Sequence, residues 1–440
     1  MNSRVDQISR YRGAPGVHID FVTLEKSTEF KTGVPVFVGF GQLADDSASK
    51  YSQQGFWCRV TSWQQFNRSV EKMCPSGYLQ DAVRGFFENG GESCVIVPVP
   101  WVEGSNDSVE ADKSCIDALI RPFTDDMINQ NDANNSTGSR CILEDIEDID
   151  LMCVPDLMMM DNLKSKAYIM EAQRQILQHC KKMGDRFAIL DMPLQALHID
   201  QEKDSRNSFI DTEVVGRVIE HRYQISGSEG AIYFPWICVH GNNGELKSIP
   251  PCGHVAGIYA RSDAKEGVFK APANETVEGA FDLSISLTIN QHTELNNAGV
   301  NCFRSFPNRG IRVWGAKTLS AFQQDQYISI RRLFLTLVRW IKVNTRDLIF
   351  ETNDATLRDR IKFRLEGYCY QLYEKGALMG KSPEEAYYVK CDRELNDPSA
   401  RESGKVISEI ALAPIAPAEF IIIRIIQSAE GIVASELSLN

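Results

Sequence analysis

The chain is 440 residues long, which is enough for two or three domains with a well-buried core. Hydrophobic residues make up 43% and charged residues 24%, as in ordinary globular proteins, and no apolar run approaches the ~20 residues that span a bilayer. The formal net charge of −12 argues against a general nucleic-acid binder.

The first residues are polar and charged, without the apolar stretch of a secretory signal, which predicts folding in a cytoplasm. The twelve cysteines form no C-x-x-C pair, and most of them stand beside apolar residues. Because disulfides are rare in reducing compartments, we expect free thiols that pack as small core residues.

The first two thirds of the chain alternate between apolar runs typical of strands and amphipathic helical patterns. Residues 17–22 alternate like a strand, although no hairpin turn near them offers a partner. Residues 101–150 interrupt the alternation and contain a polar, turn-rich loop at 129–139. The strands are expected at 34–39, 93–99, 151–156, 187–191 and 231–239, and the helices at 63–66, 79–87 and 167–183. This order predicts an α/β fold.

The last third has a different pattern, with two long helices followed by strands. The first helix is expected at 327–343, and the second begins after Asp354, a residue suited to cap its amino end. Strands are expected at 386–391 and 418–427, and the second is hydrophobic on both faces. Such a strand needs a pairing partner, because as an open edge it would aggregate.

Charge is unevenly distributed along the sequence. Residues 101–150 hold 13 acids and 3 bases, whereas residues 301–380 hold 7 acids and 14 bases. This asymmetry suits ordered contacts with charged partners. The pattern alone equally fits a solvated acidic loop and an ordinary basic helix face.

No group of residues with a catalytic or cofactor-binding pattern emerges from the sequence. The segment GALMGKS at 376–382 is one residue short of a phosphate-binding loop and follows a helix instead of a strand. Gly39 and Gly41 lack the third glycine of a dinucleotide fingerprint, and His179 and His254 lack the partners of a zinc site. We therefore predict no enzyme activity and no catalytic, cofactor-binding or metal-binding residues.

Several segments, in the same order along the chain, resemble contractile tail sheath proteins. They include FETND at 350–354, EAYYVKCD at 385–392 and APAEFI at 416–421. The longest is NCFRSFPNRGIRVWGAKTL at 301–319, followed by YISIRRL at 327–333. The stretch TEFKTGVPVFV at 28–38 resembles the antifeeding-prophage and virulence-cassette type. Residues 101–150 fit the family least and resemble a variable insertion.

The resemblance implies a multidomain α/β and α+β protein. It implies an amino-terminal arm at 1–25, an outer α/β domain at 26–290 with the acidic insertion at 101–150, a tube-proximal α+β domain at 296–415, and a carboxy-terminal arm at 416–440. It implies a structural subunit that forms stacked hexameric rings around an inner tube and contracts to drive the tube through a target envelope. Its partners would be copies of itself, sheath paralogues, the tube, the baseplate and a terminal cap, without nucleic acid, membrane insertion or cofactor. The particle would be a phage virion or a released extracellular particle.

The resemblance also implies two kinds of contact residue. Sheath subunits exchange terminal strands, which would engage Val17, Ile19, Phe21, Phe420, Ile422, Arg424 and Ile426. A helix of the carboxy-terminal domain attaches to the tube, which would engage Arg358, Arg360, Lys362 and Arg364. Two alternatives remain open: the arms pair within their own subunit, and the basic helix face is merely solvated.

Two other functions fit the sequence less well. A non-contractile scaffold or adhesin would share the lack of a catalytic pattern, but it would remain a soluble monomer that binds a cell surface. An α/β enzyme would share the alternation of strands and helices, but its turnover would depend on a particular carboxylate or cysteine.

Overall fold

A computed structural model describes most of the chain. The described residues are 30–44, 57–101, 109–124, 141–162, 164–194, 212–241, 244–415, 421–428 and 431–437. The residues from Thr32 onward form one compact unit. The predicted amino-terminal arm, with Val17, Ile19 and Phe21, lies outside the described residues, as do the predicted loop at 129–139 and Phe420.

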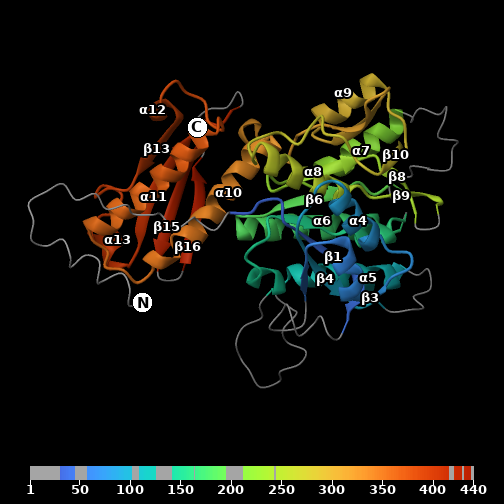
Figure 1. Cartoon of the computed structure of the whole chain (residues 1–440), viewed down its shortest axis with the longest axis horizontal. Coiled ribbons are helices and arrows are strands. Elements are labelled where there is room, and N and C mark those ends of the chain that lie inside the picture. Colours follow the sequence, from blue (N-terminus) through green and yellow to red (C-terminus); the bar gives the residue numbers. More distant parts are fainter. Residues whose placement is uncertain are drawn as a thin grey trace, which may run out of the picture. The chain divides into compact units, whose positions relative to one another are not determined.

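A nine-stranded mixed sheet forms the centre of the α/β sandwich (Figure 1). Its strands follow the order β12-β11-β7-β6-β5-β1-β4-β2, and β3 pairs with β1. The strands from β11 to β4 are parallel, while β12, β2 and β3 are antiparallel to their neighbours. The strands are β1 (Pro35–Leu43), β2 (Cys58–Val60), β3 (Val70–Met73), β4 (Cys94–Val99), β5 (Leu151–Cys153), β6 (Phe187–Asp191), β7 (Gly230–Phe234), β11 (Asn301–Phe306) and β12 (Gly310–Trp314).

Both faces of this sheet are covered, which explains why its strands read as continuous apolar runs. Val36 and Val38 of β1 face one core, whereas Phe37 between them faces the other. Successive side chains of a strand point to opposite faces, so an apolar residue is required at every position. The strands predicted at 34–39, 93–99 and 187–191 are confirmed. The strand predicted at 151–156 is shorter, because it ends at Cys153 and a 3₁₀ helix follows at Pro155–Met160.

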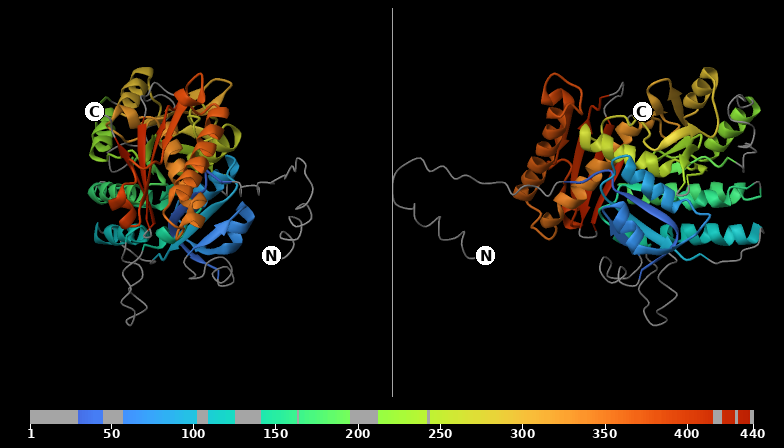
Figure 2. Two further views of the ribbon diagram at one scale, coloured as in Figure 1. Left: turned by 90° about the vertical axis from the view of Figure 1, so that its left-hand side faces the viewer. Right: turned by 45° about the vertical axis from the view of Figure 1, so that its right-hand side comes forward.

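Helices cover the sheet on its two sides (Figure 1, Figure 2). One core contains residues of α5 (Val109–Ile120), α6 (Lys166–Met183) and α7 (Thr212–Gln224). The other contains residues of α3 (Trp63–Ser69), α4 (Leu79–Glu88) and α8 (Cys252–Lys265). The predicted acidic insertion contributes to the first core through Ile116 and Leu119 of α5, so its described part is integral to the fold.

The segment predicted as one strand at 231–239 is divided between two sheets. β7 ends at Phe234, and β8 (Ile237–His240) joins a separate three-stranded sheet with the order β10-β8-β9. Its other strands are β9 (Leu246–Ile249) and β10 (Ala280–Leu283). The apolar run alone did not reveal the break, because residues on both sides of it are buried.

The carboxy-terminal sheet is antiparallel, with the order β13-β14-β15-β16. Two long helices, α10 (Ile328–Asn344) and α11 (Ala355–Glu374), share one apolar core with it (Figure 2). The strands are β13 (Tyr387–Lys390), β14 (Val406–Leu412), β15 (Ile421–Ser428) and β16 (Gly431–Leu437), and the remaining helices are α9 (Ile289–Asn297), α12 (Pro383–Ala386) and α13 (Pro398–Glu402). The predicted cap is confirmed, since the Asp354 carboxylate accepts a hydrogen bond from the Leu357 amide. The α/β and α+β fold class predicted from the sequence is confirmed as well.

The predicted domain boundary near 290–296 does not coincide with a change of sheet. β11 and β12 follow it in sequence but extend the nine-stranded sheet. The carboxy-terminal sheet and its helices begin only with α10, at Ile328. The reason is that β11 pairs directly with β7, although the three strands of the small sheet lie between them in the sequence. Such a long-range contact has no local signal in the sequence.

Buried ion pairs hold α10 against the α/β sandwich. The Arg332 guanidinium donates to Asp263 of α8 at 2.8 and 2.5 Å and lies 3.4 Å from Asp150, directly before β5. Asp150 also accepts hydrogen bonds from the Gly33 and Val34 amides. Burial alone would lower the pKa of Arg332, but the neighbouring Asp263 outweighs it and raises that pKa, so the guanidinium stays charged.

All twelve cysteines are free thiols, as predicted, and ten of them are buried. Burial raises the pKa of Cys58 and of Cys369 to about 12. Within the part of the chain that the structure describes, no helix is both long enough and apolar enough to cross a membrane.

We predict that Arg332→Met lowers the free energy of unfolding by about 3–5 kcal/mol, because it leaves Asp150 and Asp263 buried without their cation. Urea denaturation followed by circular dichroism measures the change. The control is Arg346→Met, which removes an exposed ion pair with Glu147 and should change stability by about 0–1 kcal/mol. Equal effects of the two substitutions would contradict the structural role of Arg332.

Candidate functional site

The carboxyl edge of a parallel sheet is where α/β proteins usually bind ligands, and here it holds two buried carboxylates. Asp156 lies three residues after the end of β5, and its two oxygens accept hydrogen bonds from the Phe40, Tyr78 and Leu79 amides. Asp191, at the end of β6, accepts one from the Cys252 amide at 2.9 Å. Both carboxylates therefore satisfy the amino ends of helices instead of facing a substrate.

These carboxylates remain difficult to ionise. Burial raises the pKa of Asp156 to about 6, although three amide hydrogen bonds oppose the shift. Burial raises the pKa of Asp191 to about 7, against the opposing effect of hydrogen bonds from Cys252. Raised carboxyl pKa values occur in enzyme active sites, but both groups are fully enclosed by the amino ends of α4 and α8.

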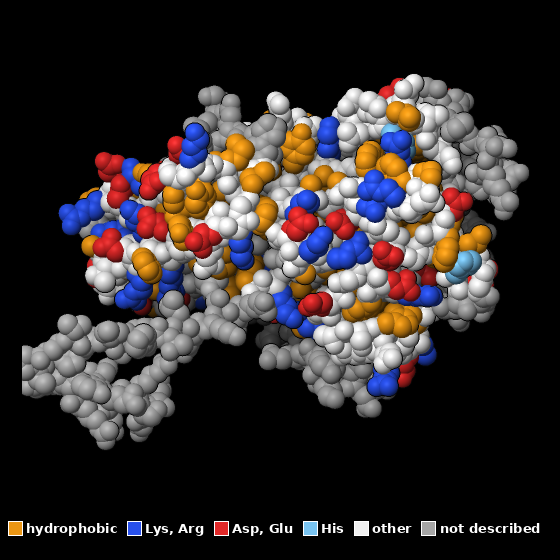
Figure 3. All heavy atoms as spheres, turned by 45° about the horizontal axis from the view of Figure 1, so that its top comes forward, with side chains coloured by type: hydrophobic (Ala, Val, Ile, Leu, Met, Phe, Trp, Pro, Cys, Tyr) orange, Lys and Arg blue, Asp and Glu red, His pale blue; other side chains and the backbone are white. Residues whose placement is uncertain are grey.

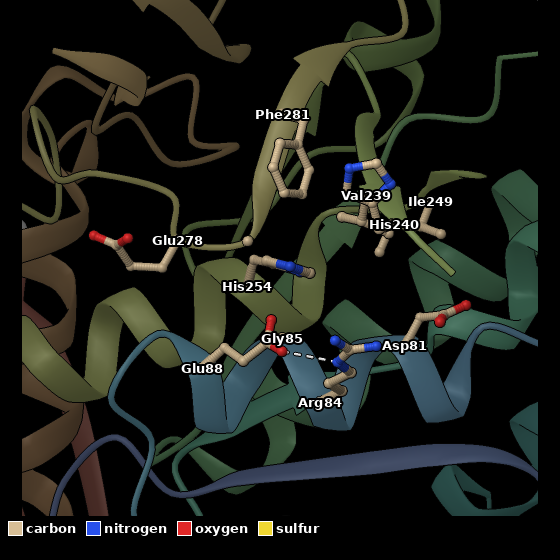
Figure 4. Close-up of a pocket in the computed structure, with 11 residues that line it drawn as sticks. Asp81, Arg84, Gly85, Glu88, Val239, His240, Ile249, His254, Glu278 and Phe281 are labelled. Carbon is tan, nitrogen blue, oxygen red and sulfur yellow. Dashed lines mark hydrogen bonds and ion pairs between the residues drawn. The ribbon is translucent and has the colours of Figure 1, made fainter. Parts of the chain in front are cut away.

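A pocket of about 550 Å³ lies between α4, α8 and the three-stranded sheet (Figure 4). Arg84 and Glu88 of α4 pair at 2.8 Å along its floor, while Asp81 pairs with Lys247 at 2.7 Å. The buried His254 ring reaches into the pocket from α8, close to Gly85, where any larger residue would collide with the ring.

The pocket offers little for acid–base chemistry. Burial, aided by the positive charge of Arg84, lowers the pKa of His254 to about 4, so the imidazole is neutral at physiological pH. Two of the three lining carboxylates, Asp81 and Glu88, are held by cations of the same chain, and the third is Glu278. No group of three or more histidine, cysteine or acidic side chains arranged to hold a metal occurs among the described residues.

The four predicted tube-attachment cations lie on α11 but in unlike environments. Arg358 is only 5% exposed, so it cannot present its charge to a partner in this conformation. Arg360 pairs with Glu351 at 2.6 Å, Arg364 with Asp347 at 2.6 Å, and Lys362 lies 3.7 Å from Glu366. Of the four residues predicted to attach to the tube, three are therefore at least partly exposed cations with acidic neighbours, and the fourth is buried.

This matching is visible on the molecular surface. On the face shown in Figure 3, lysine and arginine side chains alternate with acidic ones instead of forming one continuous basic area. The burial of Arg358 had a signal in the sequence. At about 100° per residue it falls between Leu365 and Cys369 on the helix, inside the apolar stripe.

The solvent face of α11 carries exposed aromatic side chains, which the sequence analysis missed. Phe363 is 77% exposed and Tyr370, one heptad further on, is 44% exposed. Phe350, in the turn before the helix, is 93% exposed and has a positive φ of 72°. Aromatic residues exposed in this way are typical of interaction surfaces.

The strand predicted at 418–427 lies inside the carboxy-terminal sheet where it is described. β15 pairs with β14 on one side and with β16 on the other, all antiparallel. Ile422 stands opposite Ala411, Arg424 opposite Glu409, and Ile426 opposite Ile407. In the single chain the partner of this apolar strand is therefore β14 of the same chain. β16 was not predicted.

Two family models match this chain, and they are adjacent along it. The "Phage tail sheath protein central domain" matches residues 143–319, and the "Phage tail sheath C-terminal domain" matches residues 323–428. Together they account for well over half of the sequence. The chain belongs to the phage tail sheath family. The junction between the two models, at 319–323, lies between β12 and α10, where the structure changes from one sheet to the other.

Curated relatives agree with this assignment. The tail sheath protein of Salmonella phage ViI is 27% identical over 263 residues, which are 55% of this chain and 39% of the phage protein. A putative prophage major tail sheath protein of Pseudomonas aeruginosa strain UCBPP-PA14 is 24% identical over 179 residues. The sheath chain spans less than half the length of the curated relatives that it matches.

Solved structures cover the chain more completely. A chain from the anti-feeding prophage baseplate shares 25% identity with a TM-score of 0.63, over 92% of this chain and 97% of that one. A chain of the anti-feeding prophage helical sheath in the contracted state shares 26% identity with a TM-score of 0.61, over the same fractions. The likeness therefore covers both the α/β sandwich and the carboxy-terminal sheet.

The raised pKa of Asp191 gives a prediction for stability against pH. A carboxyl with a pKa of about 7 in the folded protein and about 4 in the unfolded chain costs no stability below about pH 4. The cost grows as the pH rises from about 4 to about 7, because only the unfolded chain ionises there, and it is constant at higher pH. Asp191→Asn keeps an acceptor oxygen for Cys252 without ionising. Relative to wild type, the variant should gain stability between about pH 4 and pH 8.

Chemical denaturation at several pH values measures this difference. Glu402→Gln is the control, since that carboxylate is exposed on α13 and its loss should leave the pH profile unchanged. A constant difference between Asp191→Asn and wild type at all pH values would contradict the raised pKa.

Proposed function

We propose that this chain is the structural subunit of a contractile sheath, which polymerises around an inner tube and contracts to drive the tube through a target envelope. The observation that carries the proposal is the likeness to a solved contracted helical sheath along 92% of the chain. The two carboxylates described at the carboxyl edge of the sheet, Asp156 and Asp191, accept hydrogen bonds from backbone amides, which fits a structural role for them.

Contraction in this scheme needs no nucleotide. An extended sheath is a metastable lattice, and a trigger releases it into a second lattice whose contacts between subunits have lower free energy. The rigid element in each subunit would be the α/β sandwich with α10 fixed to it by Arg332. Motion between subunits would then fall on the terminal arms and on exposed surfaces.

The tube partner would meet the solvent face of α11. Phe363 lies opposite the buried stripe of this helix and is its most exposed large apolar side chain. Around it, Arg360 and Lys362 are in exposed ion pairs with Glu351 and Glu366. Such pairs contribute only about 0–1 kcal/mol each, so these cations can exchange their carboxylate for one on an acidic tube at low cost.

We predict that Phe363→Ala weakens attachment of the sheath chain to tubes about tenfold, because an exposed aromatic anchor typically contributes more than 1 kcal/mol. Cosedimentation of the full-length chain with purified tubes measures the affinity. Phe281→Ala is the matched control, since Phe281 is 62% exposed on β10 of the small sheet. If both variants bind tubes as wild type does, α11 is not the attachment site.

Strand exchange would link the subunits. β15 lies between β14 and β16, and its backbone hydrogen bonds to β14 can be made equally by β15 of a neighbouring chain. Each such bond contributes on the order of 1 kcal/mol, so an exchanged strand would hold subunits together through contraction. The amino-terminal arm at 1–25 would add a second exchanged strand.

A disulfide can distinguish exchange from pairing within one chain. Residues 409 and 424 stand opposite each other in β14 and β15, at the Cα separation of about 4.5–5.5 Å that a disulfide spans. We predict that Glu409→Cys with Arg424→Cys, oxidised in assembled sheaths, gives a ladder of covalent multimers on a non-reducing gel.

Either single cysteine variant is the control and should migrate as a monomer, since the native cysteines form no disulfides. A double variant that assembles, oxidises fully and still migrates as a monomer would show that β15 pairs with its own chain. The exchange would then be excluded for this strand.

The remaining partners follow from the same proposal. The sheath would assemble in a bacterial cytoplasm on its tube, in contact with a baseplate and a terminal cap, and would act in a phage or in an extracellular particle. Electron microscopy of purified particles tests the proposal as a whole. Helical polymers with an extended and a contracted lattice are expected, whereas a protein that stays monomeric in the presence of tubes would refute it.

A further inference from the structure

A second cleft, of about 390 Å³, lies between α9 and the end of β12, away from both α11 and the pocket of Figure 4. Ile289, His292 and Asn296 of α9 line one side of it. Arg304 of β11 and Trp314 of β12 line the other. The described residues that line the cleft include no carboxylate.

Arg304 is held in place by aromatic rings. Its guanidinium lies over the Phe306 ring at 4.9 Å and over the Trp314 ring at 5.7 Å. Arg309, at the exposed turn between β11 and β12, also lies over Phe306, at 5.9 Å. Neither arginine has a carboxylate partner among the described residues. Within the described part of the chain, the Arg304 charge is thus preorganised by stacking and has no acidic partner.

The rest of the cleft combines polar donors with exposed apolar surface. The Nδ1 atom of His292 is buried without a hydrogen-bond partner among the described residues. Ile289 is 68% exposed and Trp314 is 40% exposed. Trp and Arg together are the residues most often found at the energetic centre of protein interfaces. A carboxylate next to an apolar side chain matches both parts of this surface.

We propose that this cleft binds an acidic segment of a second copy of the chain, residues 125–128. That segment reads Asp-Asp-Met-Ile, which places two carboxylates beside two apolar side chains. It belongs to the acidic stretch at 101–150, in which the described Glu144 and Glu147 already pair with Lys182 and Arg346 of their own chain. The choice of a second copy rests on the proposed function, in which copies assemble.

The contact would join unlike surfaces of two copies. A heterologous contact of this kind repeats from subunit to subunit and produces a ring or a helical polymer. Because part of its free energy comes from opposite charges near the surface, the contact weakens as salt shortens the Debye length, which is roughly 8 Å at physiological ionic strength.

The cleft is tested first with a peptide and the unassembled full-length chain. The probe is a dye-labelled peptide of residues 124–134, and its binding is measured by fluorescence anisotropy. Arg304→Gln should weaken binding about tenfold, as expected for the loss of a charge-assisted hydrogen bond. Arg68→Gln, which removes an exposed arginine of α3, should not. A peptide carrying Asp125→Asn, Asp126→Asn and Asp132→Asn should bind weakly even to the wild-type chain.

The second copy is tested by exchanging the charges. Arg304→Glu with Arg309→Glu should reduce the length of sheaths on tubes, and adding Asp125→Lys with Asp126→Lys should restore it. Circular dichroism verifies that each variant is folded. If a charge-reversed variant is not folded, sheath length on tubes is measured with the Arg304→Gln chain instead.

Each outcome decides one part of the proposal. Equal affinity of the peptide for wild type and Arg304→Gln would overturn the cleft as an acid-binding site, whatever the chain does on tubes. Binding of the peptide without restoration by the exchanged charges would overturn the second copy as its source. If no variant, wild type included, forms sheaths, the proposed function fails while the peptide result stands.

Discussion

The buried contact of Arg332 with Asp263 and Asp150 is the interaction on which the arrangement of this chain depends. Burying three charges is costly unless each is matched, so the contact specifies one position for α10 instead of merely adding stability. Through it the helix that opens the carboxy-terminal sheet is tied to α8 and to the start of β5, two elements of the large sandwich. Arg331 with Glu229 and Lys342 with Asp185 repeat the same device along the helix. In the proposed sheath, this fixed junction would transmit force between the nine-stranded sheet and the carboxy-terminal sheet.

The sequence was sufficient wherever structure follows from local pattern. The strands of the large sheet were recognisable because both of its faces are buried, and the start of α11 was recognisable because Asp354 caps it. The boundary near 290–296 was misplaced because β11 joins the sheet by pairing with β7, which is distant in sequence. The division of 231–239 was missed because burial continues across it. Both errors concern long-range partners, which a pattern of neighbouring residues does not contain.

For the predicted contact residues as well, local features were predictable and features that depend on other elements were not. That α11 would be amphipathic was evident, but the ion pairs of Arg360 and Arg364 depend on Glu351 and Asp347, which lie in the turn before the helix. The exposed Phe363 was not among the predicted contact residues of α11, because those were selected by their charge. Arg358 shows that a long side chain can carry charge within an apolar stripe, where its stem packs and its head is enclosed. Charge counted along a helix is therefore a poor guide to charge offered to a partner.

The twelve free cysteines have a consequence for the durability of a particle that leaves the cell. Oxidation by dissolved oxygen or exchange with external disulfides proceeds through the thiolate. With pKa values of about 12, Cys58 and Cys369 are almost entirely protonated in neutral medium, and their burial excludes reagents. A lattice built from such subunits would carry its ten buried thiols into an oxidising environment without cross-links through them. These thiols would then form no bond that a rearrangement of the lattice outside the cell has to break.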